Sequence, residues 1–249
     1  MLLDHHHGHY QFLKGIGPYS CGVVAMPGYE IMHSRLMQPM PLHLGYEQMV
    51  KRLKHQGRSI KALCGMQLRI PAPLSFDGFA GFNQEYQQKL MELDLFLEGV
   101  NPLARTNIAV PALGIQEPML HAFSYTIPSN LKVPTFIVAG AGDLRDQTNL
   151  SPEAMVRPGE TSEDALREKA SVVMAMMQER LSGLQVDWPL VTAVDVYTTH
   201  PVYPYLVDTV LQPMGKANWH GINWYFGEPP IQGLDFEMDV RGVRTEQVI

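Results

Sequence analysis

Hydrophobic and polar residues in the second half of the chain alternate between the spacing of strands and the spacing of helices. A run such as VPTFIVAGAG is short, apolar and closed by glycines, as buried strands are. Residues 157–184 instead repeat apolar side chains every three or four positions, and Thr161 with Asp164 resembles a capping box. The predicted elements are a strand at 133–142, a helix at 157–184, a strand at 190–200, a short helix at 202–215, and strands at 219–226 and 234–242.

The first half of the chain follows the same order. Its predicted elements are a strand at 29–39, a helix at 42–57, a strand at 59–70, a helix at 79–97, and strands at 104–110 and 119–126. Residues 124–134, between the halves, are rich in proline and serine and predict a linker. We therefore expect two tandem domains, 1–128 and 129–249, each with a mostly antiparallel sheet and two helices on one face. This is an α+β fold in which the other face of each sheet is left for a partner.

Composition narrows the class of protein without identifying it. Of the 249 residues, 45% are hydrophobic and 18% are charged, as in soluble globular proteins. The formal charge of −6 argues against a nucleic-acid binder, and no stretch predicts a membrane span. With only Cys21 and Cys64, no disulfide framework is expected and a cytoplasmic location is predicted. The N-terminal tract DHHHGHY lacks the fixed spacing of a metal site and is expected to be a poorly ordered tail.

An arginine stands directly in front of an apolar strand pattern in NPLARTNIAV, where Ile108 and Val110 alternate with more polar or smaller residues. A guanidinium stays charged at neutral pH, so burying it without a partner is very costly. Arg105 is either a strand-end residue that reaches water or an acid, or a fork presented to the carboxylate of a small ligand.

Three motifs of the first half occur in a fixed order: GIGPYSCGV (15–23), FAGFNQEYQQKL (79–90) and LARTNIAV (103–110). This series resembles the RidA/YjgF family of enamine and imine deaminases, which carry a GPYS-type opening, an F-x-x-x-N-x-x-Y helix and a P-x-R-x-x-V-x-V strand. The resemblance covers most of residues 15–127, whereas the second half matches by layout and by a few residues such as the glycines of AGAG.

The resemblance implies a chorismate-mutase-like fold, in which sheets from three domains close a barrel and ligands bind in clefts between neighbouring domains. Arg105 would bind the substrate carboxylate, and Tyr19 and Asn83 would line the same cleft. Taken singly, Tyr19 could be a packed turn residue and Asn83 a helix-surface or cap residue. Because each chain supplies two domains, the smallest uniform closed assembly is a homotrimer of six domains. No metal or organic cofactor is expected.

The first half departs from the family pattern near the predicted site. The family's deaminases usually place a glutamate fifteen residues after the arginine, and that position here is Leu120, followed by His121. A one-residue shift along a strand turns a side chain to the opposite face, so His121 replaces the glutamate only if a bulge intervenes. Ser34 and Arg35 stand where the family has a glycine near the ligand, and the extra cation of Arg35 either binds a second substrate carboxylate or fills the site.

The second half shows the opposite pattern. Aligning WHGINWYF with ARTNIAV puts His220 at the arginine's position, and fifteen residues later come Asp235 and then Glu237 and Asp239, predicted on one strand face. These acids are either a solvated strand face or the groups that hold water, and His220 is of the residue type that most often transfers protons in catalysis. Asp235, His220 and Glu237 are the candidate catalytic residues. If each ring of an assembly used one kind of domain, Arg105 and Asp235 would never share a cleft.

Two functions follow. The first is hydrolytic deamination of a small enamine or imine acid of the 2-aminoacrylate, ureidoacrylate-derived or 2-aminomuconate type, with its carboxylate held by Arg105. The alternative is a binding or regulatory module that keeps the carboxylate pocket and lacks the acid that activates water, as Leu120 suggests. A ribonuclease fits poorly, since the chain is acidic and has no basic, aromatic-interleaved stripe.

Overall fold

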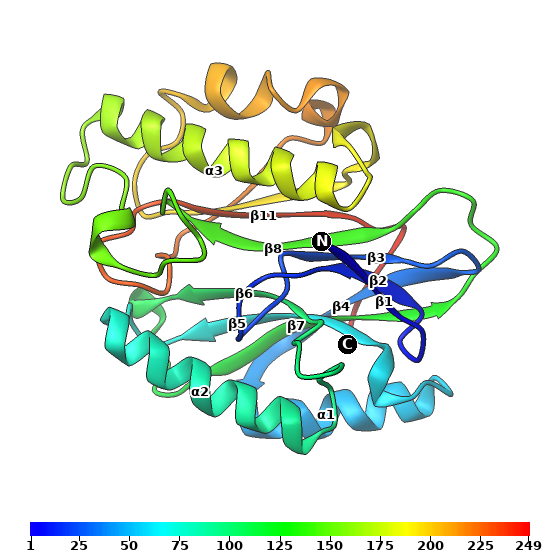
Figure 1. The fold of residues 1–249 in the computed structure, drawn as a ribbon. Helices are drawn as coiled ribbons and strands as arrows, with labels where there is room; N and C mark the ends of the chain where they lie inside the picture. The colour runs from blue at the N-terminus through cyan, green and yellow to red at the C-terminus, as the bar shows by residue number, and fades with distance from the viewer.

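The chain folds into four layers, with two β-sheets packed face to face between helices (Figure 1). The computed structural model describes residues 1–249. Helix α3 covers the outer face of one sheet, and α1 and α2 cover the outer face of the other. The helices are α1 Leu42–His55, α2 Phe76–Glu92 and α3 Glu163–Gly183. The strands are β1 Leu2–His5, β2 Tyr10–Leu13, β3 Gly22–Ala25, β4 Tyr29–Pro41, β5 Leu63–Ile70, β6 Ala104–Ala109, β7 Met119–Pro128, β8 Phe136–Gly142, β9 Ala193–Tyr197, β10 Asn223–Tyr225, β11 Glu237–Gly242 and β12 Thr245–Val248.

The five-stranded sheet has the order β12-β4-β7-β5-β6. Its pairs are antiparallel except for β5 with β6 and β12 with β4. All six elements predicted for the first half are present. The helices bury the expected stripe against this sheet, with residues three or four positions apart. The buried side chains of α2 are Phe79, Asn83, Tyr86 and Leu90.

The seven-stranded sheet has the order β1-β2-β3-β8-β11-β9-β10 and is antiparallel except for β9 with β10. Three predictions for this half need correction. The helix predicted at 202–215 is a short π-helical segment, Leu206–Leu211, and the strand predicted at 219–226 shrinks to β10. Helix α3 is capped by Ser162 instead of Thr161, because Ser162 has the extended backbone of an N-cap and its hydroxyl accepts from the amide of Ala165.

Both sheets contain four strands connected and paired in the same way. In chain order, the first, fourth, second and third strands lie side by side, as β4-β7-β5-β6 and as β8-β11-β9-β10. Strands from each end of the chain then extend the sheet of the other half, since β3 pairs with β8 and β12 pairs with β4. The division into 1–128 and 129–249 stays a prediction, and these strand pairs cross it.

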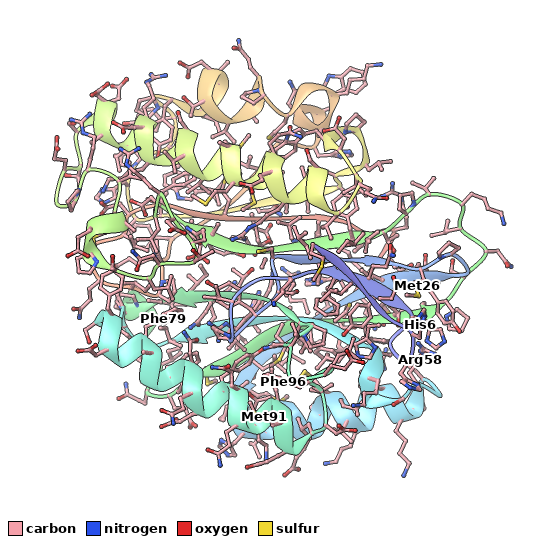
Figure 2. The ribbon with its side chains drawn as sticks, viewed as in Figure 1. His6, Met26, Arg58, Phe79, Met91 and Phe96 are labelled. Atoms are coloured by element: carbon pink, nitrogen blue, oxygen red, sulfur yellow. The ribbon has the colours of Figure 1, made fainter.

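The histidine-rich N-terminus is ordered, contrary to expectation. Strands β1 and β2 form an antiparallel hairpin around it, and the side chain of His5 is buried. The ring of His9 stacks on that of Tyr29 at 3.9 Å, and Arg58 contacts both residues. Figure 2 shows His6, Met26 and Arg58 together at this end of the molecule. The physical reason is the two-residue alternation that begins with Tyr10 and Phe12, which buries one face of β2 and so orders the strand that pairs with it.

The layer between the sheets is apolar in one part and polar in another. Tyr10, Phe12 and Ile137 belong to a buried cluster that spans both sheets. Strand β11 turns Met238 and Val240 toward α3 and therefore turns Glu237, Asp239 and Arg241 toward the other sheet. None of the helices is long and apolar enough to cross a membrane.

Candidate active site

Arg105 is buried near the beginning of β6, the edge strand of the five-stranded sheet. Its Nη2 donates to Oδ1 of Asn83 at 2.7 Å, and its Nη1 is buried without a hydrogen-bond partner. Four aromatic rings surround the guanidinium, at centroid distances of 4.6 Å for Tyr86, 5.1 Å for Tyr19, and 5.6 Å for Phe79 and Phe82. The cation thus reaches neither bulk water nor an acid, and cation–π contacts partly replace its hydration.

The elements around Arg105 are anchored to one another. The ring of Tyr19 comes from a tight turn whose next residue, Ser20, donates its amide to the carbonyl of Leu103 at 2.8 Å. Asn101 donates its side-chain amide to the carbonyl of Pro18 at 2.8 Å, which fixes the same turn beside β6. Figure 2 shows Phe79 at the beginning of α2, on the side of the helix that faces the strands.

A pocket joins Arg105 to Glu237 of the other sheet. Asn107, two residues after Arg105, also lines it, and both polar atoms of its side-chain amide are buried without partners. Buried polar groups are nearly always hydrogen-bonded, so unpartnered atoms from Arg105 and Asn107 in one pocket indicate a polar ligand. The pocket therefore has the features of a binding site for a small anion.

Glu237 is the first residue of β11, and its side chain is buried. Burial and, secondarily, the nearby Asp239 carboxyl raise the pKa of Glu237 well above its ordinary value, although Arg105 and Arg180 act in the opposite direction. The group therefore holds its proton at a pH where an exposed glutamate is ionised, and it can both donate and accept a proton.

Gly140 of β8 makes room for Glu237. A Cβ atom at this position would lie 2.3 Å from Oε1 of Glu237 and 2.9 Å from Cγ2 of Thr106 on β6. The amide of Gly140 donates to the Thr106 hydroxyl at 3.1 Å, which joins the two sheets at this point. Figure 1 shows β6 and β8 next to each other between α3 and α2. The glycine of AGAG thus permits a close approach of strands and of the acid.

The structure brings together four of the seven predicted site residues: Arg105, Tyr19, Asn83 and Glu237. Arg105 and Glu237 come from different halves of one chain. An assembly in which each ring contains one kind of domain does not predict this pairing. The prediction missed Asn107, although its position two residues after Arg105 on the same strand face was a usable signal.

Asp235 lies outside this pocket, contrary to the prediction. It precedes β11, so the alternation that places Glu237 does not extend to it. Its carboxylate pairs with the buried Lys169 of α3 and with Nε2 of His200 at 3.1 Å. The same lysine lies 3.5 Å from the carboxylate of Asp143. Asp235 is therefore part of an internal ion cluster beneath α3.

His220 and Arg35 also lie elsewhere. His220 ends an exposed 3₁₀ segment, Gly215–His220, three residues before β10 begins, so the alignment that placed it on a strand was wrong. Arg35 of β4 lines a different cavity, together with His121. Leu120, where a glutamate was expected, is fully buried in the core beneath α1 and α2. The acid opposite Arg105 comes instead from β11 of the other sheet.

Comparisons with known proteins agree over nearly the whole chain. The model of the 2-aminomuconate deaminase CnbZ family matches residues 2–247. A 2-amino-5-chloromuconate deaminase of Comamonas testosteroni is 35% identical over 244 residues, which cover 97% of this chain and 96% of that protein.

Two solved structures are more distant. A Thermotoga maritima protein described as a candidate endoribonuclease is 17% identical, with a TM-score of 0.32, over 44% of this chain and 79% of its own. A chorismatase is 10% identical, with a TM-score of 0.46, over 90% of this chain and 77% of its own. Since both TM-scores are below 0.5, the assignment depends on the sequence matches alone. By those matches, the chain belongs to the 2-aminomuconate deaminase CnbZ family.

Proposed function

We propose that this chain hydrolytically deaminates a 2-aminomuconate-type enamine acid in the pocket between Arg105 and Glu237. Family membership supports the substrate class. The observation that carries the proposal is a buried guanidinium without an acidic partner, opposite a buried carboxyl group whose pKa is raised.

Arg105 binds the carboxylate next to the amino-bearing carbon. Asn83 occupies Nη2 and so fixes the plane of the guanidinium, which leaves Nη1 to donate to the ligand. A charge-assisted hydrogen bond of this kind is about twice as strong as a neutral one. The Asn107 amide then offers one donor and one acceptor to a second polar group of the substrate.

Glu237 moves the protons. In its protonated form it donates to the carbon adjacent to the amino-bearing carbon, which converts the enamine to an iminium ion. The resulting carboxylate takes a proton from water as the water oxygen forms a bond to the iminium carbon. The carbinolamine then collapses: its C–N bond breaks, ammonia leaves with a proton from the hydroxyl group, and a 2-oxo acid remains. Atoms balance as enamine plus water gives 2-oxo acid plus ammonia, and general acid–base catalysis of this kind contributes about 10²–10⁴-fold.

The same proposal includes the wider organisation expected from the motifs. The repeated strand order supports two RidA/YjgF-like copies of a chorismate-mutase-like unit in one chain. Such chains would assemble as a cytoplasmic homotrimer that acts on a small carboxylate without a cofactor, a nucleic acid or a membrane. The non-catalytic alternative was motivated by the missing glutamate after Arg105, and Glu237 supplies an acid in that pocket.

The direct test is release of ammonia from 2-aminomuconate by the purified full chain. We expect Arg105→Met to lower kcat/KM by about 10²–10³-fold, because the substrate carboxylate loses its charged partner. Arg244→Met is the matched control, since Arg244 is exposed and outside the pocket. Undiminished turnover in Arg105→Met would overturn the role of Arg105, and saturable binding without ammonia release would leave the binding-module alternative.

A further inference from the structure

A second cavity lies between the two sheets, and none of its lining residues lines the pocket between Arg105 and Glu237. Its volume is about 290 Å³. The walls come from β4, β5, β7 and β12 of the five-stranded sheet and from β9, β10 and β11 of the other. Arg35 and His121 both face it, and the proposed reaction uses neither of them.

Both acids on the cavity wall pair with the same arginine. Arg241 donates to Asp195 and to Glu246, both at 2.6 Å, so its charge is compensated within the chain. Arg35 is exposed and forms no ion pair. Arg35 is therefore the one guanidinium of the wall without an acidic partner, and its N–H groups can donate to a carboxylate.

His121 adds an unpartnered donor or acceptor to the same wall. Its Nδ1 is buried and makes no hydrogen bond. Burial first, and then Arg69, Arg35 and Arg241, lower the pKa of His121 to about 3. The ring is neutral at physiological pH, so it presents one N–H and one lone pair without adding a charge.

Arg69 does not line the cavity, but it packs against a residue that does. Its guanidinium lies over Tyr197 at 5.5 Å and over Tyr225, which lines the cavity, at 5.8 Å. Its Nη2 is buried and has no hydrogen-bond partner, and no acid pairs with it. Arg35, which has no acidic partner, and His121, whose Nδ1 has no hydrogen bond, thus both line a cavity large enough for a six-carbon acid.

We propose that this cavity is a second binding site for a small carboxylate, held by Arg35 and His121. The site is separate from the Arg105 pocket, and it does not depend on the proposed deamination. It also assigns a role to the extra cation of the first half: Arg35 binds a carboxylate here and does not touch the substrate at Arg105.

The test is calorimetric titration of trans,trans-muconate, a dicarboxylate with no amino group to release. The titrations use the full-length Arg105→Met variant, in which the first pocket is disabled. We expect this variant to keep one saturable site. Adding Arg35→Met or His121→Phe should weaken binding at that site by at least about tenfold. Adding Arg244→Met removes the same charge outside the cavity and should leave binding unchanged. Thermal unfolding of each variant shows whether it is folded.

Two results would overturn the second site. One is no saturable binding by the Arg105→Met variant, and the other is equal binding with and without Arg35→Met and His121→Phe. Neither result affects ammonia release by the wild-type chain, and absence of ammonia release does not affect this titration. The two proposals can therefore fail independently.

Discussion

The two halves of the chain contribute unlike groups to the pocket although their strands are paired in the same order. In the first half, β6 carries Arg105, whereas its counterpart β10 carries no arginine. In the second half, β11 begins with the acid Glu237, whereas its counterpart β7 carries the fully buried Leu120 near its start. Each half thus provides one of the two groups that the reaction needs, the carboxylate-binding cation and the acid that transfers protons. The site exists only because the two sheets pack against each other.

The largest effect should come from removing the acid of the second half. We expect Glu237→Gln to lower kcat by about 10²–10⁴-fold, because the amide keeps the size of the side chain but cannot transfer the protons. KM should change little, since Arg105 and Asn107 are intact. Glu179→Gln on the exposed face of α3 is the matched control and should keep wild-type activity. Steady-state assays of ammonia release measure both, and an active Glu237→Gln would assign the proton transfers to another group.

The next effect should come from disturbing the contact between the halves. Gly140→Ala places a methyl group against Glu237 and Thr106, at distances that no real Cβ tolerates. Because the side chain and the strand must shift, we expect kcat/KM to fall by about ten- to a hundredfold. Gly81→Ala on α2 meets no atom within 4 Å and should leave activity unchanged. Equal activity of the two variants would show that the approach of β8 to β6 does not set the geometry.

Much of the fold could be predicted from periodicity, and its failures have physical causes. Short apolar runs and two-residue alternation located β4 to β9 and β11, and spacing of three or four residues located the three helices, because these elements bury one or both of their faces. Prediction failed at 202–215 and 219–226, where prolines and glycines interrupt the pattern and short irregular turns replace regular elements. It also failed at the N-terminus, where the hairpin is stabilised by long-range contacts with Tyr29 and Arg58.

The site residues that belong to short sequence motifs could be predicted from the sequence. Arg105, Tyr19 and Asn83 were found in this way. Glu237 was found as one acid among several, but which acid faces Arg105 depends on sheet-to-sheet packing, and spacing along one strand does not report that. Asp235 was predicted because it lies fifteen residues after His220. That spacing does not identify the acid in the pocket, because β11 begins two residues later, at Glu237.

A smaller effect of Glu237→Gln concerns the stability of the fold: the substitution that lowers activity should raise the free energy of unfolding at high pH. Glu237 keeps its proton in the folded chain above the ordinary pKa of 4.5. Below that pH both the folded and unfolded states are protonated. Above it the unfolded state ionises first, so the free energy of unfolding falls as pH rises toward the folded pKa. Glutamine cannot ionise, so Glu237→Gln should match the wild-type Tm near pH 4.

Near pH 8 the same variant should melt several degrees above wild type, since about 1 kcal/mol corresponds to roughly 2–4 °C in a chain of this size. Glu179→Gln, an exposed position, should show no such divergence between the two pH values. Calorimetric melting curves at both pH values measure the difference. A constant offset at both values would mean that Glu237 is ionised in the folded chain.

The smallest effect should come from removing the N-cap of one helix in each half. Ser75 caps α2 by accepting from the amide of Gly78 at 3.1 Å, and Ser162 caps α3 by accepting from Ala165 at 3.3 Å. Replacing either serine by alanine should cost about 1 kcal/mol, or roughly 2–4 °C in Tm. Thr161→Ala should cost less than either, because Thr161 makes no cap.

The two serine variants should nevertheless differ in KM. The beginning of α2 carries Phe79, which contacts the Arg105 guanidinium, whereas no residue of α3 lines the pocket. Ser75→Ala should therefore raise KM slightly and Ser162→Ala should not, and equal KM values would show that α2 holds Arg105 without its capped first turn.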